Sequence, residues 1–467
     1  MYRKLIATVM SVAVLAGISN AQNARVDAMG GYSLMEDHAR ILYNPVYTNN
    51  FSNTVQLTYD RGSATDSRVG PLFAIKSFGF LNFGLSYTGD RILGEHVYDH
   101  FINDVLGSAS NLGNLEVAHI DPIPNILFGM DLNFLQIGAR AYYERASLKY
   151  YERDQVGTDV TEINLKEKFV NMGIVGGMRL DLHPLVVTAK LGMGVPGLNA
   201  SYEMQTSAGT HRVSASTSQG INLELGGEAR ISVAQTDLIG GLDMSTTGYS
   251  GKWEETPVGG PTTVHDNFNS YSITSTYVYG GAERNLAAHN MLLGAVLYAG
   301  MTSTTSEPDE VTYQNTKNTI RELSYGVNAG LEKTWDDLNR LDAIIGRMGL
   351  RTRTSMTVDR DKGESGADSY EDRYSSPASR TGFDLSLGLG VRKNMMQFDA
   401  VISPFALQNP FKLALGQLPS NDFAKFTMTL DFGATRSAQR TTQSTTTSTP
   451  SSTPSERPTF TPGERSW

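Results

Sequence analysis

The sequence predicts an all-β fold: a transmembrane antiparallel β-barrel of about 14–16 strands with an N-terminal plug segment. Three observations predict it: an export signal, period-two alternation of apolar and polar residues, and connections that alternate between short and long. The 467 residues contain no cysteine, which excludes a disulfide framework, thiolate metal sites and cysteine nucleophiles. The net charge of −9 argues against a nucleic-acid partner.

Residues 1–21 have the pattern of a secretory signal peptide. Arg3 and Lys4 supply a basic start, an apolar stretch runs from Leu5 to Ile18, and small residues precede a cleavage site after Ala21. This stretch is shorter than the ~20 apolar residues that span a bilayer, which favours cleavage over the alternative of an N-terminal membrane anchor. We therefore expect an exported protein of the outer membrane of a Gram-negative-type bacterium.

Residues 54–433 carry the strand signal, because apolar and polar residues alternate with period two. Clear examples are the stretches 135–144, 221–233, 322–332 and 383–392. The polar face carries both signs of charge, as in Arg140, Glu228 and Glu332. This composition is typical of a polar lumen behind a lipid-facing exterior. A soluble sandwich or solenoid is the alternative, and it would bury its apolar face inside.

The predicted connections alternate between tight turns and longer polar stretches. The longer stretches are Thr88–Asp121, Tyr151–Asn164, Gln205–His211, Trp253–Asn267, Ser303–Asn318, Val358–Ser379 and Ala406–Phe423. Short periplasmic turns and long outer loops are typical of transmembrane barrels. Several predicted strands, such as the one within 185–205, exceed the ~10 residues needed to cross a bilayer. We expect them to project beyond the outer surface.

The end of the chain predicts a closing strand and a tail. Residues 426–432 alternate and end on the aromatic Phe432, which resembles the terminal strand that outer-membrane barrels present to the barrel assembly machinery. That machinery and outer-membrane lipid are the expected partners. Residues 434–467 are rich in Ser, Thr and Pro and are expected to be disordered.

Residues 22–53 precede the first predicted strand and carry a recognisable pattern. Its residues are Ala24, Arg25, Met29, Gly30, Gly31, Asp37, Tyr43, Asn44 and Pro45. The pattern resembles the start of outer-membrane barrels related to the long-chain fatty-acid transporter and the type IX secretion shuttle proteins, although Val46 replaces an alanine. The resemblance implies that residues 22–53 form a lumenal plug. It also implies a gate made of Met29, Gly30, Gly31, Asp37, Asn44 and Pro45. An ordinary periplasmic lead-in is the alternative.

The stretch 95–106 predicts a short amphipathic helix. Its apolar positions are Val97, Phe101, Val105 and Leu106. The family resemblance implies that they form a landing site for a hydrophobic small-molecule ligand, and a lid packed over the barrel mouth is the alternative. His96, Asp99 and His100 have a spacing that could share a metal, but solvated histidines are the favoured interpretation, so no metal site is expected.

The function predicted from these features is transport or binding of a hydrophobic or small solute through a plugged lumen. A non-transport role in secretion or surface assembly is the alternative, and the mixed-charge lumen weakens the case for a fatty-acid-like solute. No G-x-S-x-G nucleophile motif occurs, and we expect neither an enzyme nor a cofactor.

Overall fold

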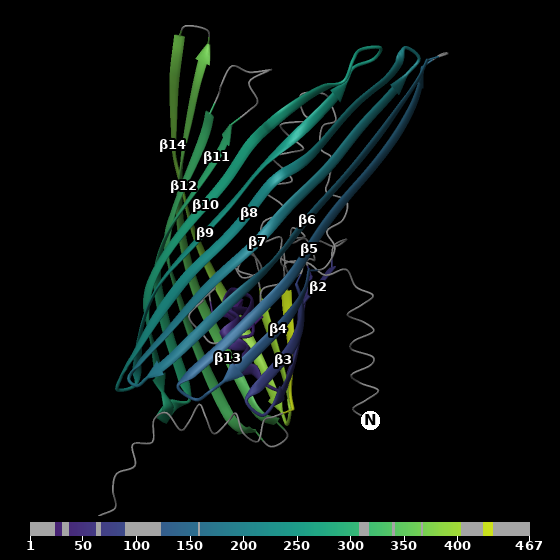
Figure 1. Ribbon diagram of the computed structural model, residues 1–467. Coiled ribbons are helices and arrows are strands. Elements are labelled where there is room, and N and C mark those ends of the chain that lie inside the picture. Colours follow the sequence, from purple (N-terminus) through teal and green to yellow (C-terminus); the bar gives the residue numbers. More distant parts are fainter. Residues whose placement is uncertain are drawn as a thin grey trace, which may run out of the picture. The chain divides into compact units, whose positions relative to one another are not determined.

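The computed structural model describes residues 24–29, 37–61, 67–88, 123–156, 159–307, 317–338, 341–365, 368–402 and 424–432. The described residues form 16 strands that close into one antiparallel barrel (Figure 1). Each strand pairs with its neighbours in sequence, and β1 closes the barrel against β16. The predicted all-β antiparallel barrel and its even strand number are therefore confirmed.

The strands differ widely in length. The shorter strands are β1 (Thr54–Arg61), β2 (Ser67–Phe78), β3 (Leu81–Thr88), β4 (Ile123–Asp131), β11 (Met291–Glu307), β15 (Met396–Ile402) and β16 (Ala424–Asp431). The longer strands are β5 (Leu135–Val156), β6 (Asp159–Leu182), β7 (Leu185–Thr206), β8 (Gly209–Val233), β9 (Thr236–Thr256), β10 (Thr263–Leu286), β12 (Lys317–Leu338), β13 (Leu341–Ser365) and β14 (Asp368–Lys393).

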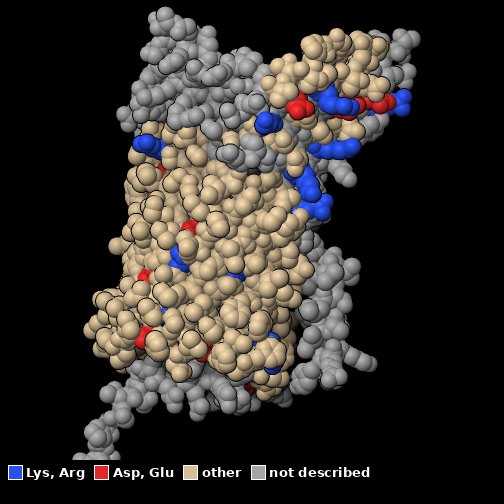
Figure 2. Space-filling view, in the orientation of Figure 1, with Lys and Arg blue, Asp and Glu red and all other residues tan. Residues whose placement is uncertain are grey.

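The outside of the barrel is apolar and the inside is polar. Leu191, Met193 and Leu297 on the outer face are 57–65% exposed, whereas the lumenal Asn222, Glu228 and other polar side chains are buried. Charged side chains are sparse on much of the wall that Figure 2 shows and gather on one projecting part. A soluble barrel would bury its apolar face, so this arrangement identifies a lipid-facing wall.

One end of the barrel carries the short turns. Asn133, Asn290 and Asn394 occupy turn positions with φ of 69°, 46° and 53°, a region that asparagine tolerates better than most residues. At the other end the longer strands reach 21–26 residues. Roughly 10 residues suffice to cross a bilayer, so these strands extend well beyond a membrane.

Three of the predicted loops are wrong. The predicted loop Gln205–His211 is a tight turn, because β7 runs to Thr206 and β8 begins at Gly209. The other two are 151–164 and 358–379. Residues 151–156 continue β5 and pair with the start of β6, where Tyr151 lies opposite Asn164. Residues 358–365 continue β13, and Val358 lies opposite Ser375 of β14. The sequences of these stretches lack the apolar–polar alternation that would indicate a strand. Backbone pairing between consecutive strands is enough to extend the hairpins.

The described helices are short. They are α2 (Ala24–Ala28), α3 (Ala39–Tyr43) and the 3₁₀ helices η1 (Pro45–Phe51) and η3 (Ala287–His289). Within the part of the chain that the structure describes, no helix is long and apolar enough to cross a membrane. The predicted signal peptide 1–21, helix 95–106 and tail 434–467 lie outside the described residues.

Candidate functional site

The described residues 24–29 and 37–53, here called the N-terminal segment, lie inside the barrel (Figure 1). Ala24, Met29, Ile41 and Val46 are fully buried. Ile41 and Val46 pack with lumenal side chains such as Phe73 in one apolar cluster. The segment therefore contacts the inner wall through a packed apolar face, and its polar residues make the contacts described next.

A chain of buried and partly buried ion pairs joins α2 to three strands. The Nε and Nη2 atoms of Arg25 donate to the two carboxylate oxygens of Glu332 on β12, each at 2.9 Å. Glu332 also accepts from Arg347 Nε on β13 at 2.7 Å. Arg347 Nη1 in turn donates to Asp399 Oδ1 on β15 at 2.5 Å. Removing one member of such a buried network leaves an uncompensated charge, at a cost of about 3–5 kcal/mol.

These partners stabilise the charged form of the Arg25 guanidinium. Burial alone would lower the pKa of its guanidinium, but the Glu332 carboxylate outweighs burial and raises that pKa above its ordinary value. The charges of Asp37 and Asp399 act in the same direction. Asp37, one of the predicted gate residues, is itself buried. Arg25 therefore stays charged inside the barrel.

A second buried cluster joins α3 and η1 to the wall. Arg40 Nη2 pairs with Glu228 Oε2 of β8 at 2.5 Å. The hydroxyls of Tyr47 and Tyr279 also donate to this carboxylate, at 3.3 and 2.9 Å. The Arg40 guanidinium lies 4.5 Å from the centroid of the Tyr47 ring, within the range of a cation–π contact. The two clusters thus attach the segment to separate parts of the barrel, β8–β10 and β12–β15.

The Tyr43-Asn44-Pro45 motif lies directly against the inner wall of β5–β7. Asn44 Oδ1 accepts a hydrogen bond from the Val46 amide at 3.2 Å, and Asn44 Nδ2 donates to the Ala189 carbonyl at 3.4 Å. A Cβ at Gly177 would overlap Asn44 Oδ1, and a Cβ at Gly138 would overlap the Pro45 carbonyl. Glycine is therefore required at both wall positions for this close approach.

His38 is buried and neutral beside the motif. Its Nε2 lies 2.9 Å from Thr54 Oγ1, and its ring stacks on Phe51 with centroids 4.1 Å apart. Burial, with a smaller contribution from the positive charge of Arg25, lowers the pKa of His38 to about 3. The imidazole is a structural element of the segment at neutral pH.

The predicted gate residues divide into two groups. Met29, Asp37, Asn44 and Pro45 are buried within the N-terminal segment. Gly30 and Gly31 lie outside the described residues, as do the predicted landing-site residues Val97, Phe101, Val105 and Leu106. The roles assigned to all of them stay predictions.

Sequence reasoning missed the wall carboxylates as attachment points for the segment. Glu228 and Glu332 stood out only as charges on a polar strand face, and nothing in the sequence pairs them with Arg40 and Arg25. Among the described residues, no group of three or more His, Asp or Glu side chains is placed to hold a metal ion. His96, Asp99 and His100 lie outside that part of the chain.

Polar side chains also line other parts of the described lumen, beside an apolar cluster in which Ile239 and Val296 pack with Met29. Asn171 donates to Glu144 at 3.2 Å, and Asn222 links the Tyr142 hydroxyl to Thr247 through bonds of 3.1 and 3.2 Å. Further from the short turns, Glu322 and Arg353 form an ion pair whose side chains are 43% and 50% exposed. The described lumenal face therefore offers polar and charged contacts away from the N-terminal segment.

The fold and the lipid-facing exterior define a transmembrane β-barrel of the outer-membrane type. No protein-family model matches the chain, and no curated protein matches it. The resemblance of residues 24–45 to the fatty-acid transporter family therefore stays a prediction.

Solved structures with a similar fold are outer-membrane barrels. The ferric yersiniabactin uptake receptor FyuA from Yersinia pestis is 9% identical with a TM-score of 0.30, covering 81% of this chain and 74% of that one. CdiB from Escherichia coli is 11% identical with a TM-score of 0.36, covering 81% and 62%. The beta domain of the Bordetella autotransporter BrkA is 10% identical with a TM-score of 0.28, covering 81% and 97%. At these values the likeness carries no argument about ligand, partner or mechanism.

Proposed function

We propose that this protein is a non-enzymatic outer-membrane barrel that passes a small solute through its lumen, with the N-terminal segment as the gate. The short-turn end faces the periplasm in this proposal, and the long strands project from the cell surface. The observation that carries the proposal is the attachment of the segment by two separate ion-pair clusters, Arg25–Glu332 and Arg40–Glu228.

Ion pairs suit a segment that has to move. A charged solute that reaches a lumenal ion pair competes with it for one of its partners, whereas an apolar contact offers such a solute no partner. Arg40 and Glu228 have side chains 9% and 6% exposed, so their attraction is screened little while the segment is in place. Release of both clusters would detach α2 from β12–β15 and α3 from β8–β10. The solute favoured by the polar lumenal face is small and polar.

Liposome swelling by small sugars and amino acids tests the proposal. The variant Arg40→Gln/Glu228→Gln removes one pair without leaving a lone charge, and we expect faster swelling than with the wild-type barrel. The charge swap Arg40→Glu/Glu228→Arg should restore slow swelling. Glu203→Gln is the matched control, because Glu203 pairs with Arg212 in an exposed hairpin. Equal swelling rates in all four proteins, each with normal heat-modifiable mobility, would refute the gate.

A second function is favoured by the projecting hairpins. Strands β5–β8, β13 and β14 carry paired backbone far past the length a membrane needs, and exposed ion pairs such as Arg153–Glu162 lie on them. Such a surface suits a platform for secretion or surface assembly. Truncating the β13–β14 hairpin separates the two functions. If the barrel passes a solute, the truncated protein should give the liposome swelling rate of the wild type. If the barrel is a platform, the truncated protein should lose its surface partner.

A further inference from the structure

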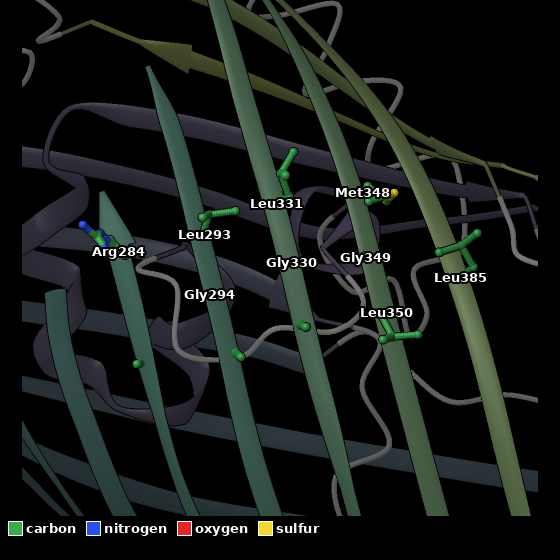
Figure 3. A pocket seen from close by; sticks show the side chains of 12 residues that line it. Arg284, Leu293, Gly294, Gly330, Leu331, Met348, Gly349, Leu350 and Leu385 are labelled. Carbon is green, nitrogen blue, oxygen red and sulfur yellow. The ribbon is translucent and has the colours of Figure 1, made fainter. Parts of the chain in front are cut away.

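The outer wall of β10–β14 contains an apolar groove near the short-turn end. It encloses about 530 Å³, within the roughly 300–1,000 Å³ of typical ligand sites. Ala282, Ala295 and Ala329 line its floor, and Leu293, Leu331 and Leu350 are among the side chains on its walls. Figure 3 shows these strands from outside, with the helices of the N-terminal segment behind them.

The groove exists because the wall is thin here. Gly294, Gly330 and Gly349 lie opposite one another on three successive strands, β11, β12 and β13. On the lumenal side a Cβ at Gly330 would overlap Met29. Ala295 and Ala329 lie opposite each other in the adjacent row and leave the outer side hollow. Small residues on both faces therefore produce the groove while the inside is filled by the N-terminal segment.

The short-turn end of the groove is positively charged. Arg284 lines the groove, is exposed, and lies opposite Leu293 in the pairing of β10 with β11. Lys333 lies two residues beyond Leu331 on β12, toward the same end, and its ammonium donates to the His289 carbonyl. Trp335, 48% exposed, follows on the same outward face. Basic and aromatic side chains in this position mark the level of the lipid headgroups.

This combination of charge and apolar surface specifies one occupant. An apolar groove on a lipid-facing wall takes a hydrocarbon chain, and cations at its headgroup end take a phosphate. A second copy of the barrel would have to place a complementary anion against Arg284, whereas this wall exposes large apolar side chains such as Leu297 and Leu323. We propose that the groove binds one phospholipid, with an acyl chain over Ala295 and Ala329 and the phosphate at Arg284.

Native mass spectrometry of the full-length barrel tests the proposal. The protein is reconstituted into phosphatidylethanolamine–phosphatidylglycerol vesicles, extracted in mild detergent, and the phospholipid retained per barrel is counted. We expect one retained phospholipid in the wild type. Arg284→Gln should weaken retention about tenfold through loss of a charge-assisted bond. Ala295→Leu/Ala329→Leu should abolish retention by filling the floor.

Matched controls lie elsewhere on the wall. Ala141→Leu places the same side chain among exposed apolar residues of β5, nearly opposite β12 in the strand order. Lys76→Gln removes an exposed cation near the same end on β2. Both controls should retain the phospholipid. Unchanged retention in Arg284→Gln would overturn the proposal even if the double Leu variant fails to fold. If the wild type has the mass of two chains and the double Leu variant has the mass of one, the groove binds a second copy of the barrel, and the proposal is overturned.

Discussion

Loss of the Glu332 charge should release α2 from the wall. Glu332 is the carboxylate shared by Arg25 and Arg347, at 2.9 and 2.7 Å, and its side chain is 12% exposed. Glu332→Gln leaves the buried guanidinium of Arg347 and the partly buried guanidinium of Arg25, whose side chain is 26% exposed, facing a neutral amide. Breaking a buried pair in this way costs about 3–5 kcal/mol. Because Arg347 keeps Asp399, we expect the penalty to act mainly on the attachment of Arg25.

The absence of cysteine from the sequence makes the release measurable with a single thiol. Met29 is fully buried against the wall, so Met29→Cys should react slowly with a maleimide added to the folded barrel. A penalty of about 3–5 kcal/mol corresponds to a rise in the exposed population of roughly 100-fold to 4,000-fold, at tenfold per 1.4 kcal/mol. Glu332→Gln in the same background should therefore accelerate labelling by at least about 100-fold.

Glu322, on the same strand as Glu332, provides the control. Glu322→Gln removes a carboxylate from the same strand, but from a half-exposed pair with Arg353, which is worth roughly 0–1 kcal/mol. It should leave the labelling rate unchanged. Equal labelling rates in Glu332→Gln and wild-type backgrounds, with both barrels folded by gel mobility, would show that the ion pair does not hold the segment.

Three further predictions concern the packing of the N-terminal segment. Gly177→Ala should lower the free energy of unfolding by about 1–3 kcal/mol through overpacking, because the new Cβ would overlap Asn44. Gly176→Ala, whose Cβ would meet no atom nearer than 3.8 Å, should be neutral. Urea unfolding in vesicles compares the two variants. Since His38 has a pKa lowered to about 3, the unfolded chain binds a proton there from about pH 6.5 downward while the folded barrel does not. Stability should fall as the pH drops from 6.5 toward 3, and His38→Gln should make this decline shallower in unfolding curves taken across that range. Asn49→Ala should cost about 1–3 kcal/mol, because the Asn49 amide donates to the carbonyls of Val46, Met130 and Ile137; an unchanged unfolding midpoint would contradict this.

The barrel was predictable because the wall obeys a local rule. Within the membrane, each strand residue faces either the lipid or the polar lumen. Period-two alternation in stretches such as 221–233 therefore indicates a strand directly. Where the strands leave the membrane, that rule no longer applies. The sequences of residues 151–156 and 358–365 do not alternate between apolar and polar residues, and their pairing depends on the neighbouring strand and not on local pattern.

The attachment of the N-terminal segment was predictable only in part. The Tyr43-Asn44-Pro45 motif indicated a segment with a fixed local conformation, and the structure places it against Gly138 and Gly177. The partners of Arg25 and Arg40 are separated from them by 307 and 188 residues. The register of every intervening strand decides which lumenal carboxylate lies beside each arginine. No local sequence pattern specifies all of these registers together.

Single-channel recording of the full-length barrel in a planar bilayer tests the central claim most directly. The account predicts that the wild-type barrel is closed most of the time and that Arg40→Gln/Glu228→Gln lengthens the open periods, while Glu203→Gln leaves them unchanged. A wild-type barrel that is permanently open, or a double variant with the closed fraction of the wild type, would contradict the claim that these buried ion pairs hold the gate shut.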